Sequence, residues 1–248
     1  MRDCRALFDQ AGYRACMRHP LLCLACAGLL VWAPAFAAST DDVAARLQAA
    51  TQAHEQGRLT VARQAFERLA RDGVPAAQYN LAVMHLRGEV PRPSNAEALR
   101  LMGLAAEHGF VTAMFEMGRL HEAHSIVDAP DPVLATQWYL RAAEAGSIDA
   151  QVAIGTGYYL GRGVPKDLAQ AAHWFREAAK GGDVGTQYLL ASMYEAGDGV
   201  DQDLRLARYW YGIAAKNGDI AAPAKVKQLD AQLGEPEPTP SPAPTTRP

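Results

Sequence analysis

Glycines recur along most of this chain at a nearly constant interval. The intervals are 36, 37, 36 and 36 residues, and the glycines are Gly73, Gly109, Gly146, Gly182 and Gly218. Eleven positions before each glycine stands an alanine: Ala62, Ala98, Ala135, Ala171 and Ala207. Such self-similarity at a fixed period is typical of repeat proteins, in which each repeat is one supersecondary unit. We therefore expect a stack of similar units rather than an irregular globule.

The second half of each repeat carries the signals of an α-helix, here called helix B. Hydrogen-bond acceptors suited to the start of this helix stand at Ser94, Asp131, Asp167 and Asp203. Ser94 and Glu97 form a capping-box pattern, and Pro132 occupies a tolerated first helical position. The apolar stripe that follows is Ala135, Trp138, Tyr139 and Ala142 in one repeat, with Trp174-Phe175 and Trp210-Tyr211 in the next two. The closing glycine suits the left-handed residue after a helix.

The first half of each repeat predicts a second helix, helix A. Its packing stripe is Ala77, Leu81 and His85, matched by Ala150, Ile154 and Tyr158 and by Thr186, Leu190 and Tyr194. Small residues at Ala82, Gly118, Gly155 and Ala191 allow the paired helix to approach closely. Each hairpin leaves an apolar face uncovered, so neighbours must stack. The predicted fold class is all-α, a right-handed α/α solenoid of stacked helix hairpins, with each Trp burying roughly 200 Å².

The same motifs resemble the Sel-1-like repeat, a 36-residue relative of the tetratricopeptide repeat. The resemblance rests on Ala-Gln-Tyr-x-Leu-Ala at 77–82, Gly-x-Gly-Val-x-x-Asp at 161–167 and Ala-x-x-Trp-aromatic-x-x-Ala-Ala-x-x-Gly at 171–182. It covers roughly residues 74–222 and implies scaffolding in complexes and signalling. Two departures stand out: Leu101-Met102 replaces the aromatic pair in the first repeat, and the second has a longer, glycine-free loop from His121 to Pro130. We expect regular curvature to be disturbed at these places.

The first 37 residues predict a secretory signal peptide. Arg14, Arg18 and His19 precede an apolar run of about 13 residues, which Ala35-Phe36-Ala37 ends with a cleavage pattern. The run is short for a membrane anchor. Met17 begins a compact signal peptide by itself, so residues 1–16 are interpreted as an overcalled start. We expect a periplasmic or secreted protein, cleaved near Ala37 and without an integral membrane segment afterwards.

Cleavage would remove all four cysteines of the chain, at positions 4, 16, 23 and 26. The exported form would therefore depend on packing for its stability and not on disulfides. It would hold 20 basic and 25 acidic residues, a net charge of −5. This balance gives no electrostatic basis for binding nucleic acid.

The remaining sequence divides into segments by pattern and composition. We expect a tetratricopeptide-like N-terminal cap hairpin at 41–73, four Sel-1-like repeats at 74–219, a capping helix at 220–233 and a proline-rich tail at 234–248. In the tail, Pro236, Pro238, Pro240, Pro242 and Pro244 alternate with small, polar or acidic residues. Alternating proline forbids a helix and favours an extended chain. The tail is interpreted as disordered, with a docking peptide for another protein as the alternative.

Motifs for catalysis and cofactors are weak in this sequence. Gly155-Thr156-Gly157 lies within a predicted helix and follows no strand, so we interpret it as close packing and not as a nucleotide loop. No serine fits the G-x-S-x-G or S-x-x-K patterns. The segment His121–Asp131, with His124 and Asp128, gathers metal-ligand types but misses the H-E-x-x-H spacing, and a variable surface loop is the favoured interpretation. We therefore predict no catalytic residue, no cofactor and no metal site.

A second stripe along the A helices remains as the candidate binding surface. In a right-handed solenoid these positions line the concave face. The residues predicted to bind a partner there are Tyr79, Val83, Phe115, Arg119, Thr156, Tyr159, Tyr188 and Ser192. Aromatics mixed with polar groups suit a peptide groove. The alternative is that Tyr79, Phe115 and Tyr188 fill contacts between neighbouring repeats.

From this pattern we expect a non-catalytic adaptor that binds a protein or peptide of the cell envelope. It is expected to be a monomer. The competing interpretation is a cell-envelope enzyme or a glycan- or peptidoglycan-binding protein. An enzyme requires a pocket with converging titratable groups, whereas an adaptor requires a long shallow groove.

Overall fold

The computed structural model describes residues 35–123 and 129–234, and every regular element in these ranges is an α-helix. This confirms the all-α class. The eleven helices of the described ranges are α1 (Ala35–Glu55), α2 (Leu59–Arg71), α3 (Pro75–Leu86), α4 (Asn95–Glu107), α5 (Val111–Glu122), α6 (Pro132–Glu144), α7 (Ile148–Leu160), α8 (Leu168–Lys180), α9 (Val184–Ala196), α10 (Leu204–Lys216) and α11 (Ala222–Leu233). The A helices of the repeats are α3, α5, α7 and α9, and the B helices are α4, α6, α8 and α10.

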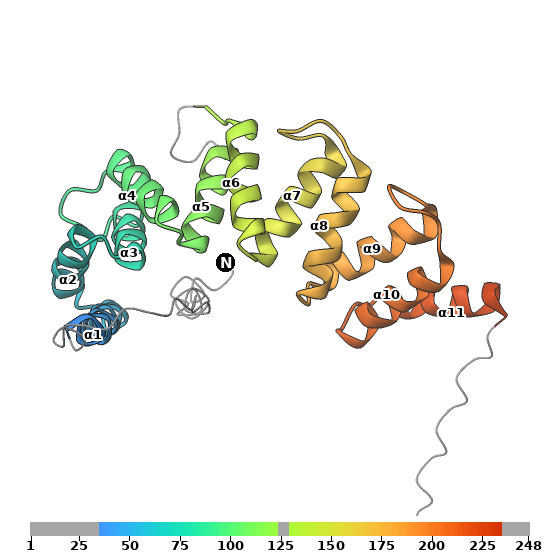
Figure 1. The fold of residues 1–248 in the computed structure, drawn as a ribbon, viewed down its shortest axis with the longest axis horizontal. Helices are drawn as coiled ribbons and strands as arrows, with labels where there is room; N and C mark the ends of the chain where they lie inside the picture. The colour runs from blue at the N-terminus through green and yellow to red at the C-terminus, as the bar shows by residue number, and fades with distance from the viewer. Residues whose placement is uncertain (1–34, 124–128, 235–248) are drawn as a thin grey trace, which may run out of the picture. The chain divides into compact units, whose positions relative to one another are not determined.

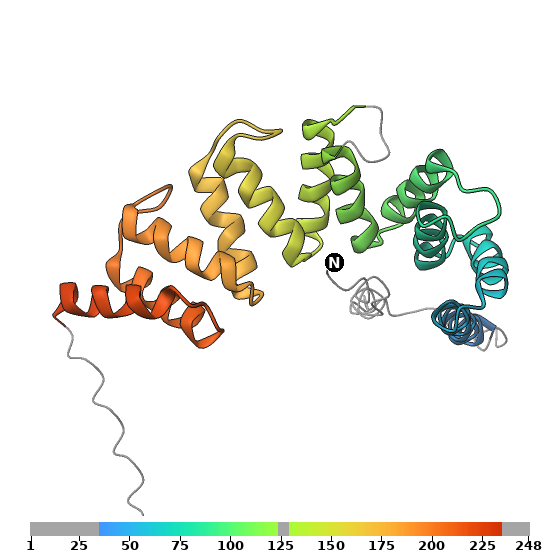
Figure 2. The same cartoon turned by 180° about the vertical axis from the view of Figure 1, so that it is seen from behind.

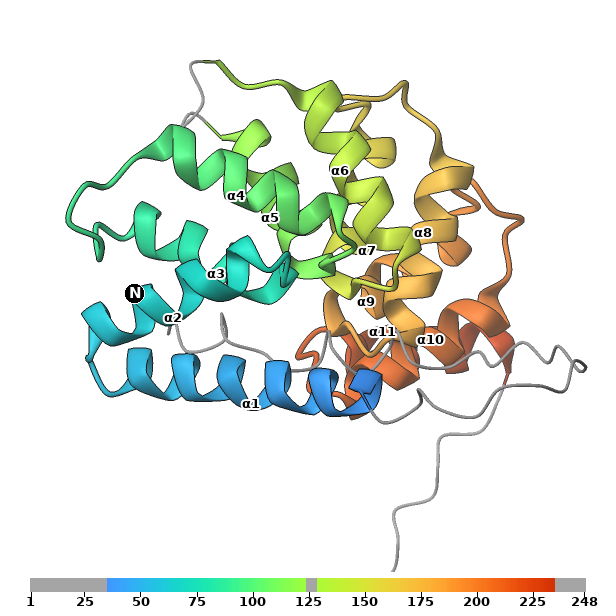
Figure 3. The ribbon, with the colours of Figure 1, turned by 60° about the vertical axis from the view of Figure 1, so that its left-hand side comes forward.

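The helices pack in sequence order within two compact units, Met1–Pro130 and Asp131–Pro248. In the first unit α1 packs on α2, α2 on α3, α3 on α4 and α4 on α5 (Figure 3). In the second unit the same succession runs from α6 to α11 (Figure 1). Each unit is therefore a pile of helical hairpins, as a solenoid requires. The boundary falls at the end of the glycine-free segment, where the sequence departs from its own repeat.

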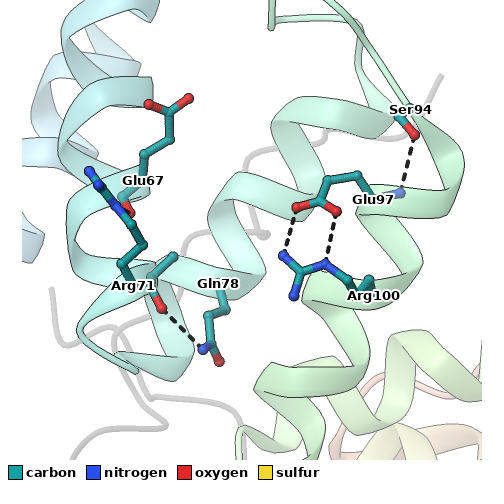
Figure 4. Close-up of polar contacts among 7 residues, drawn as sticks. Glu67, Arg71, Gln78, Ser94, Glu97 and Arg100 are labelled. Atoms are coloured by element: carbon teal, nitrogen blue, oxygen red, sulfur yellow. Dashed lines mark hydrogen bonds and ion pairs between the residues drawn. The ribbon is translucent and has the colours of Figure 1, made fainter.

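The B helices begin where the sequence predicts, because side-chain oxygens accept hydrogen bonds from their first turns. Ser94 accepts from the Glu97 amide at 3.2 Å, and Asp131 accepts from the Leu134 amide at 2.9 Å. Asp167 and Asp203 each accept from two amides. The reciprocal half of the predicted capping box does not form. The Glu97 carboxylate instead accepts two hydrogen bonds from Arg100, at 2.7 and 2.8 Å (Figure 4).

The closing glycines adopt the left-handed conformation that the helix ends require. Their φ angles are 79°, 86°, 90°, 100° and 99° at Gly73, Gly109, Gly146, Gly182 and Gly218. A second kind of glycine, in the loop from helix A to helix B, lies against the preceding repeat. A Cβ added to Gly199 would stand 2.2 Å from the carbonyl group of Leu168, the first residue of α8. This loop therefore fits only when position 199 has no side chain.

The core of each hairpin joins the predicted stripes of both helices. On helix A, Ala77, Leu81, Ala150, Ile154, Thr186 and Leu190 are buried. On helix B the residue after each tryptophan is buried (Tyr139, Phe175 and Tyr211), whereas Trp138, Trp174 and Trp210 are only half-buried. Each tryptophan therefore buries most of its surface, but less completely than the aromatic residue that follows it. The helix turns about 100° per residue, which places the second aromatic on the inner side.

A glutamine on helix A ties successive repeats together. Gln78, Gln151 and Gln187 each donate a hydrogen bond to a backbone carbonyl eight residues earlier, at 3.3, 3.3 and 3.1 Å (the first in Figure 4). Gln187 Oε1 also accepts from Asn217 Nδ2 at 2.9 Å, and Gln78 Oε1 lies 3.1 Å from His108 Nδ1. The glutamine thus connects the end of one helix B to the end of the next.

Both predicted terminal segments fall largely outside the described residues. Of the predicted signal peptide, 1–34 lie outside them, and Ala35 begins α1. Of the predicted tail, 235–248 lie outside them. Within 35–123 and 129–234, no helix combines the length and the apolar character that a membrane crossing needs.

Candidate partner-binding surface

The eight residues predicted to bind a partner lie on the four A helices, α3, α5, α7 and α9, along one stripe of each helix. Two of them are buried, two are exposed and four are half-buried. The exposed pair consists of Arg119 on α5 and Tyr159 on α7. The stripe is therefore not a uniformly accessible surface, and each unit presents its own part of it.

Tyr79 and Val83 on α3 are buried and cannot contact a partner, which corrects the prediction for both. Tyr79 is 1% exposed, and its ring centroid lies 5.2 Å from that of Phe110, in the connection to α5. Its hydroxyl has no hydrogen-bond partner among the described residues. Burial, with a smaller effect of the nearby Glu116 carboxylate, raises the pKa of this hydroxyl well above its usual value. Tyr79 therefore fills the contact between successive repeats, the alternative that the sequence left open.

The next repeat presents a charged surface on α5. Arg119 is 59% exposed in its side chain and pairs with Glu116 at 3.0 Å, one turn earlier on the helix. Phe115 lies half-buried next to Glu116 in the sequence. Salt bridges between exposed groups contribute little to folding stability, so Arg119 can exchange Glu116 for another acceptor at small cost.

In the second unit, Tyr159 near the end of α7 is the most accessible aromatic of the stripe, at 38% exposure. Its ring centroid lies 6.4 Å from that of Phe175 on α8, and the ammonium group of Lys166 lies 5.8 Å from the tyrosine ring. Thr156, one turn earlier, donates to the carbonyl of Val152 at 2.8 Å and so is satisfied within its own helix. The Tyr159 ring therefore packs against Phe175 and lies beside the positively charged Lys166 ammonium group. No spacing in the sequence indicates this role of Lys166, which stands seven residues after Tyr159 in the loop to α8.

The last members of the stripe, Tyr188 and Ser192 on α9, are half-buried because α10 covers them. The Tyr188 ring meets the Tyr211 ring edge-on at 4.9 Å. Ser192 forms a hydrogen bond to the hydroxyl of Tyr211. Both residues thus contact helix B of their own repeat, so these contacts do not bear on the alternative that Tyr188 fills a contact between neighbouring repeats.

A polar cluster that the sequence did not predict lies at the C-terminal end of α9. The Tyr211 hydroxyl donates to Glu195 at 2.7 Å, and Lys225 on α11 donates to both oxygens of Glu195 at 2.9 and 3.0 Å. Burial raises the pKa of Tyr211, and the hydrogen bond to Glu195 adds to this. The cluster attaches α11 to the last repeat. Its partners come from three helices, and no local spacing in the sequence predicts such a meeting.

The segment considered for a metal ion gives no site among the described residues. His121 lies half-buried at the end of α5, whereas His124 and Asp128 lie outside the described residues. Across 35–123 and 129–234, no three His, Cys, Asp or Glu side chains are arranged to hold a metal ion. Gly155 and Gly157 lie within α7 and pack against neighbours, as predicted.

Comparisons with known proteins agree with this architecture. The family model described as Sel1 repeat matches residues 75–110, 111–147, 148–183 and 186–219. Among solved structures, one similar chain is a protective antigen of uropathogenic Escherichia coli strains that displays an SLR fold. It is 30% identical, with a TM-score of 0.69, over 79% of this chain and 43% of that one. A Sel1 repeat protein from Oxalobacter formigenes is 39% identical, with a TM-score of 0.62, over 68% of this chain and 49% of that one. The chain thus spans less than half the length of either structure.

Proposed function

Because the chain belongs to the Sel1 repeat family, we propose that it is a non-catalytic adaptor that binds a protein or peptide through the accessible part of its A helices. The observation that carries this proposal is Tyr159, a half-exposed ring backed by Phe175 and flanked by Lys166. Tyrosine and arginine are enriched among the residues that contribute most to protein–protein binding. The fold alone supplies an extended surface and does not define a function.

The chemistry of the two exposed residues indicates what a partner must offer. Tyr159 provides an aromatic face, with its neighbour Lys166 able to meet a carboxylate. Arg119 provides a guanidinium that can bind a carboxylate or a backbone carbonyl once it leaves Glu116. An acidic peptide segment with an apolar or aromatic anchor satisfies both requirements.

The adaptor is proposed to act after export. The basic residues, the apolar run and the Ala-x-Ala pattern in residues 1–37 support a cleaved signal peptide. N-terminal sequencing of the protein recovered from the envelope fraction or the medium tests this. A first residue close to Ala38 is expected, and a first residue well before Ala35 contradicts the proposal.

The binding proposal is tested by affinity capture from an envelope extract followed by measured binding of the captured protein. The test variant is Arg119→Ala combined with Tyr159→Ala, because both side chains are exposed and their removal leaves the core intact. The control is Val133→Ala, since Val133 is an exposed apolar residue on helix B α6, outside this stripe. Loss of at least tenfold in affinity in the double variant alone supports the proposal. Equal binding by the wild type and the double variant excludes this surface.

A further inference from the structure

The outward face of α10 is apolar, although the same positions on the other B helices are mostly polar. Three positions are involved, occupied on α10 by Leu206, Tyr209 and Ile213. The equivalent residues are Gln170, His173 and Glu177 on α8, Leu134, Gln137 and Arg141 on α6, and Glu97, Arg100 and Leu104 on α4. We call the three α10 residues the α10 patch.

On the other B helices, charged side chains at these positions interact with a residue about one turn away on the same helix. Glu97 pairs with Arg100 on α4, Glu177 with Lys180 on α8, and Arg141 stacks on Trp138 of α6 at 4.4 Å. On α10, in contrast, Tyr209 is 55% exposed and Leu206 is also exposed. The Trp210 ring supports the Tyr209 ring edge-on at 5.4 Å. An exposed and supported aromatic of this kind indicates a surface that another segment covers.

The position of α11 points to the covering segment. Helices α10 and α11 pack side by side (Figure 2). Arg208 on α10 pairs with Asp230 near the end of α11, so α11 ends level with the first half of α10, which carries Leu206 and Tyr209 on another face. Gly234 caps α11 only four residues after Asp230, or about 6 Å of helical rise. The chain then continues through Glu235–Pro248 with a proline at every second position from 236 to 244. At about 3.1 Å per residue, a few of these residues suffice to reach the patch.

The chemistry of this tail matches the patch. Segments with alternating proline favour the polyproline II conformation, which docks on aromatic-lined surfaces at low entropic cost. The first turn of α10 also carries Arg205, exposed and one helical turn before Tyr209. The tail begins with Glu235 and Glu237, whose charges complement this arginine. Attachment through Gly234 gives the tail an effective concentration on the order of millimolar, so even weak contacts are populated.

We propose that residues 235–248 bind in cis to the α10 patch. The prolines lie on Tyr209 and Leu206, and the glutamates of the tail face Arg205. The bound tail covers the apolar face of the last helix B. This inference does not depend on the adaptor function, because the α10 patch and the A-helix stripe share no residue.

Paramagnetic NMR on the full chain tests the proposal. The four natural cysteines are replaced by serine, and a nitroxide is attached through Thr239→Cys. Amide signals of Leu206 and Tyr209 are expected to lose intensity relative to that of Tyr159. The variant Leu206→Gln/Tyr209→His/Ile213→Glu, which carries the residues of α8, should restore the α10 signals. The matched control Tyr159→His should leave the attenuation unchanged.

Other outcomes overturn the proposal. Attenuation spread evenly over the chain, or attenuation that survives the α8-type substitutions, shows that the tail does not bind at the patch. In a mixture of an isotope-labelled chain without the nitroxide and an unlabelled chain with it, attenuation at α10 identifies a second copy as the occupant. Far-ultraviolet circular dichroism of each variant confirms that its helices are intact.

Discussion

A Cβ added to Gly155 of α7 would stand 2.7 Å from the ring of Phe175 on α8. The ring of Phe175, one of the buried aromatics that follow a tryptophan, thus lies directly against the backbone of α7. A ring packed on all sides cannot move aside as a flexible chain end can. The absence of a side chain at 155 is therefore a requirement of the hairpin and not a sign of a nucleotide loop.

We predict that Gly155→Ala destabilises the protein by about 1–3 kcal/mol, because overpacking outweighs the gain in helix propensity. Gly212→Ala on α10 is the matched control, since no atom lies within 4 Å of its added Cβ. The control should stabilise by about 0.5–1 kcal/mol. Urea unfolding of both variants measures the difference, and equal effects would show that Phe175 does not limit position 155.

Gly199 makes a second close approach, against the backbone of Leu168 in the preceding repeat. Gly199→Ala should lower the free energy of unfolding by more than Gly218→Ala. Both glycines have positive φ angles, of 69° and 99°. Only the first meets a neighbouring backbone, because nothing lies within 4 Å of a Cβ at 218. The difference in unfolding free energy between the two variants measures the contact between repeats. Equal losses of stability would indicate that the loop does not contact α8.

The repeat architecture was predictable because it follows from the period itself. Capping residues, closing glycines and the alanine stripes are local signals repeated at fixed spacing, and each appears in the structure at the predicted place. A local sequence pattern predicted the wrong hydrogen bond where two donors compete for one carboxylate. Arg100 takes the Glu97 carboxylate that a capping box would use, since it lies one turn away on the exposed side of α4.

Exposure along the binding stripe was not predictable from the repeat. Tyr79 and Tyr188 occupy equivalent positions, yet the first is buried and the second half-buried. Their exposure depends on which neighbour covers the ring: Phe110 of the next repeat packs against Tyr79, whereas Tyr188 meets Tyr211 of its own repeat. The glutamine at 78, 151 and 187 was a missed signal, because its recurrence at a buried position indicates a required hydrogen bond.

The buried glutamine yields a third prediction. Gln187 is 2% exposed and satisfies both the carbonyl of Ala179 and the amide of Asn217. Gln187→Leu should cost about 1–3 kcal/mol, because the Ala179 carbonyl loses its glutamine donor and Asn217 its acceptor. A double-mutant cycle with Asn217→Ala should show a coupling energy of about 0.5–3 kcal/mol. Strict additivity of the two substitutions would show that the hydrogen bond between Gln187 and Asn217 does not contribute to stability.

The attachment of α11 should depend on pH through Glu195. Burial alone would raise the pKa of this carboxyl, but hydrogen bonds from Lys225 and Tyr211 together hold it below its usual value. A carboxyl with a lowered pKa in the folded state stabilises the fold above its unfolded pKa, about 4.3. That contribution is lost as the pH falls through the folded-state pKa. Acid should therefore loosen α11 below about pH 4.

Comparison of the wild type with Glu195→Gln measures this contribution directly. The wild type should be the more stable protein at neutral pH, and the difference in unfolding free energy should shrink below about pH 4, as the carboxyl becomes protonated. Hydrogen exchange of α11 amides should accelerate over the same pH range. In a Lys225→Met background the effect of Glu195→Gln should vary much less with pH, because that background lacks the Lys225 ammonium, one of the two donors that lower the pKa. An equal pH dependence in both backgrounds would assign the effect to some other carboxyl.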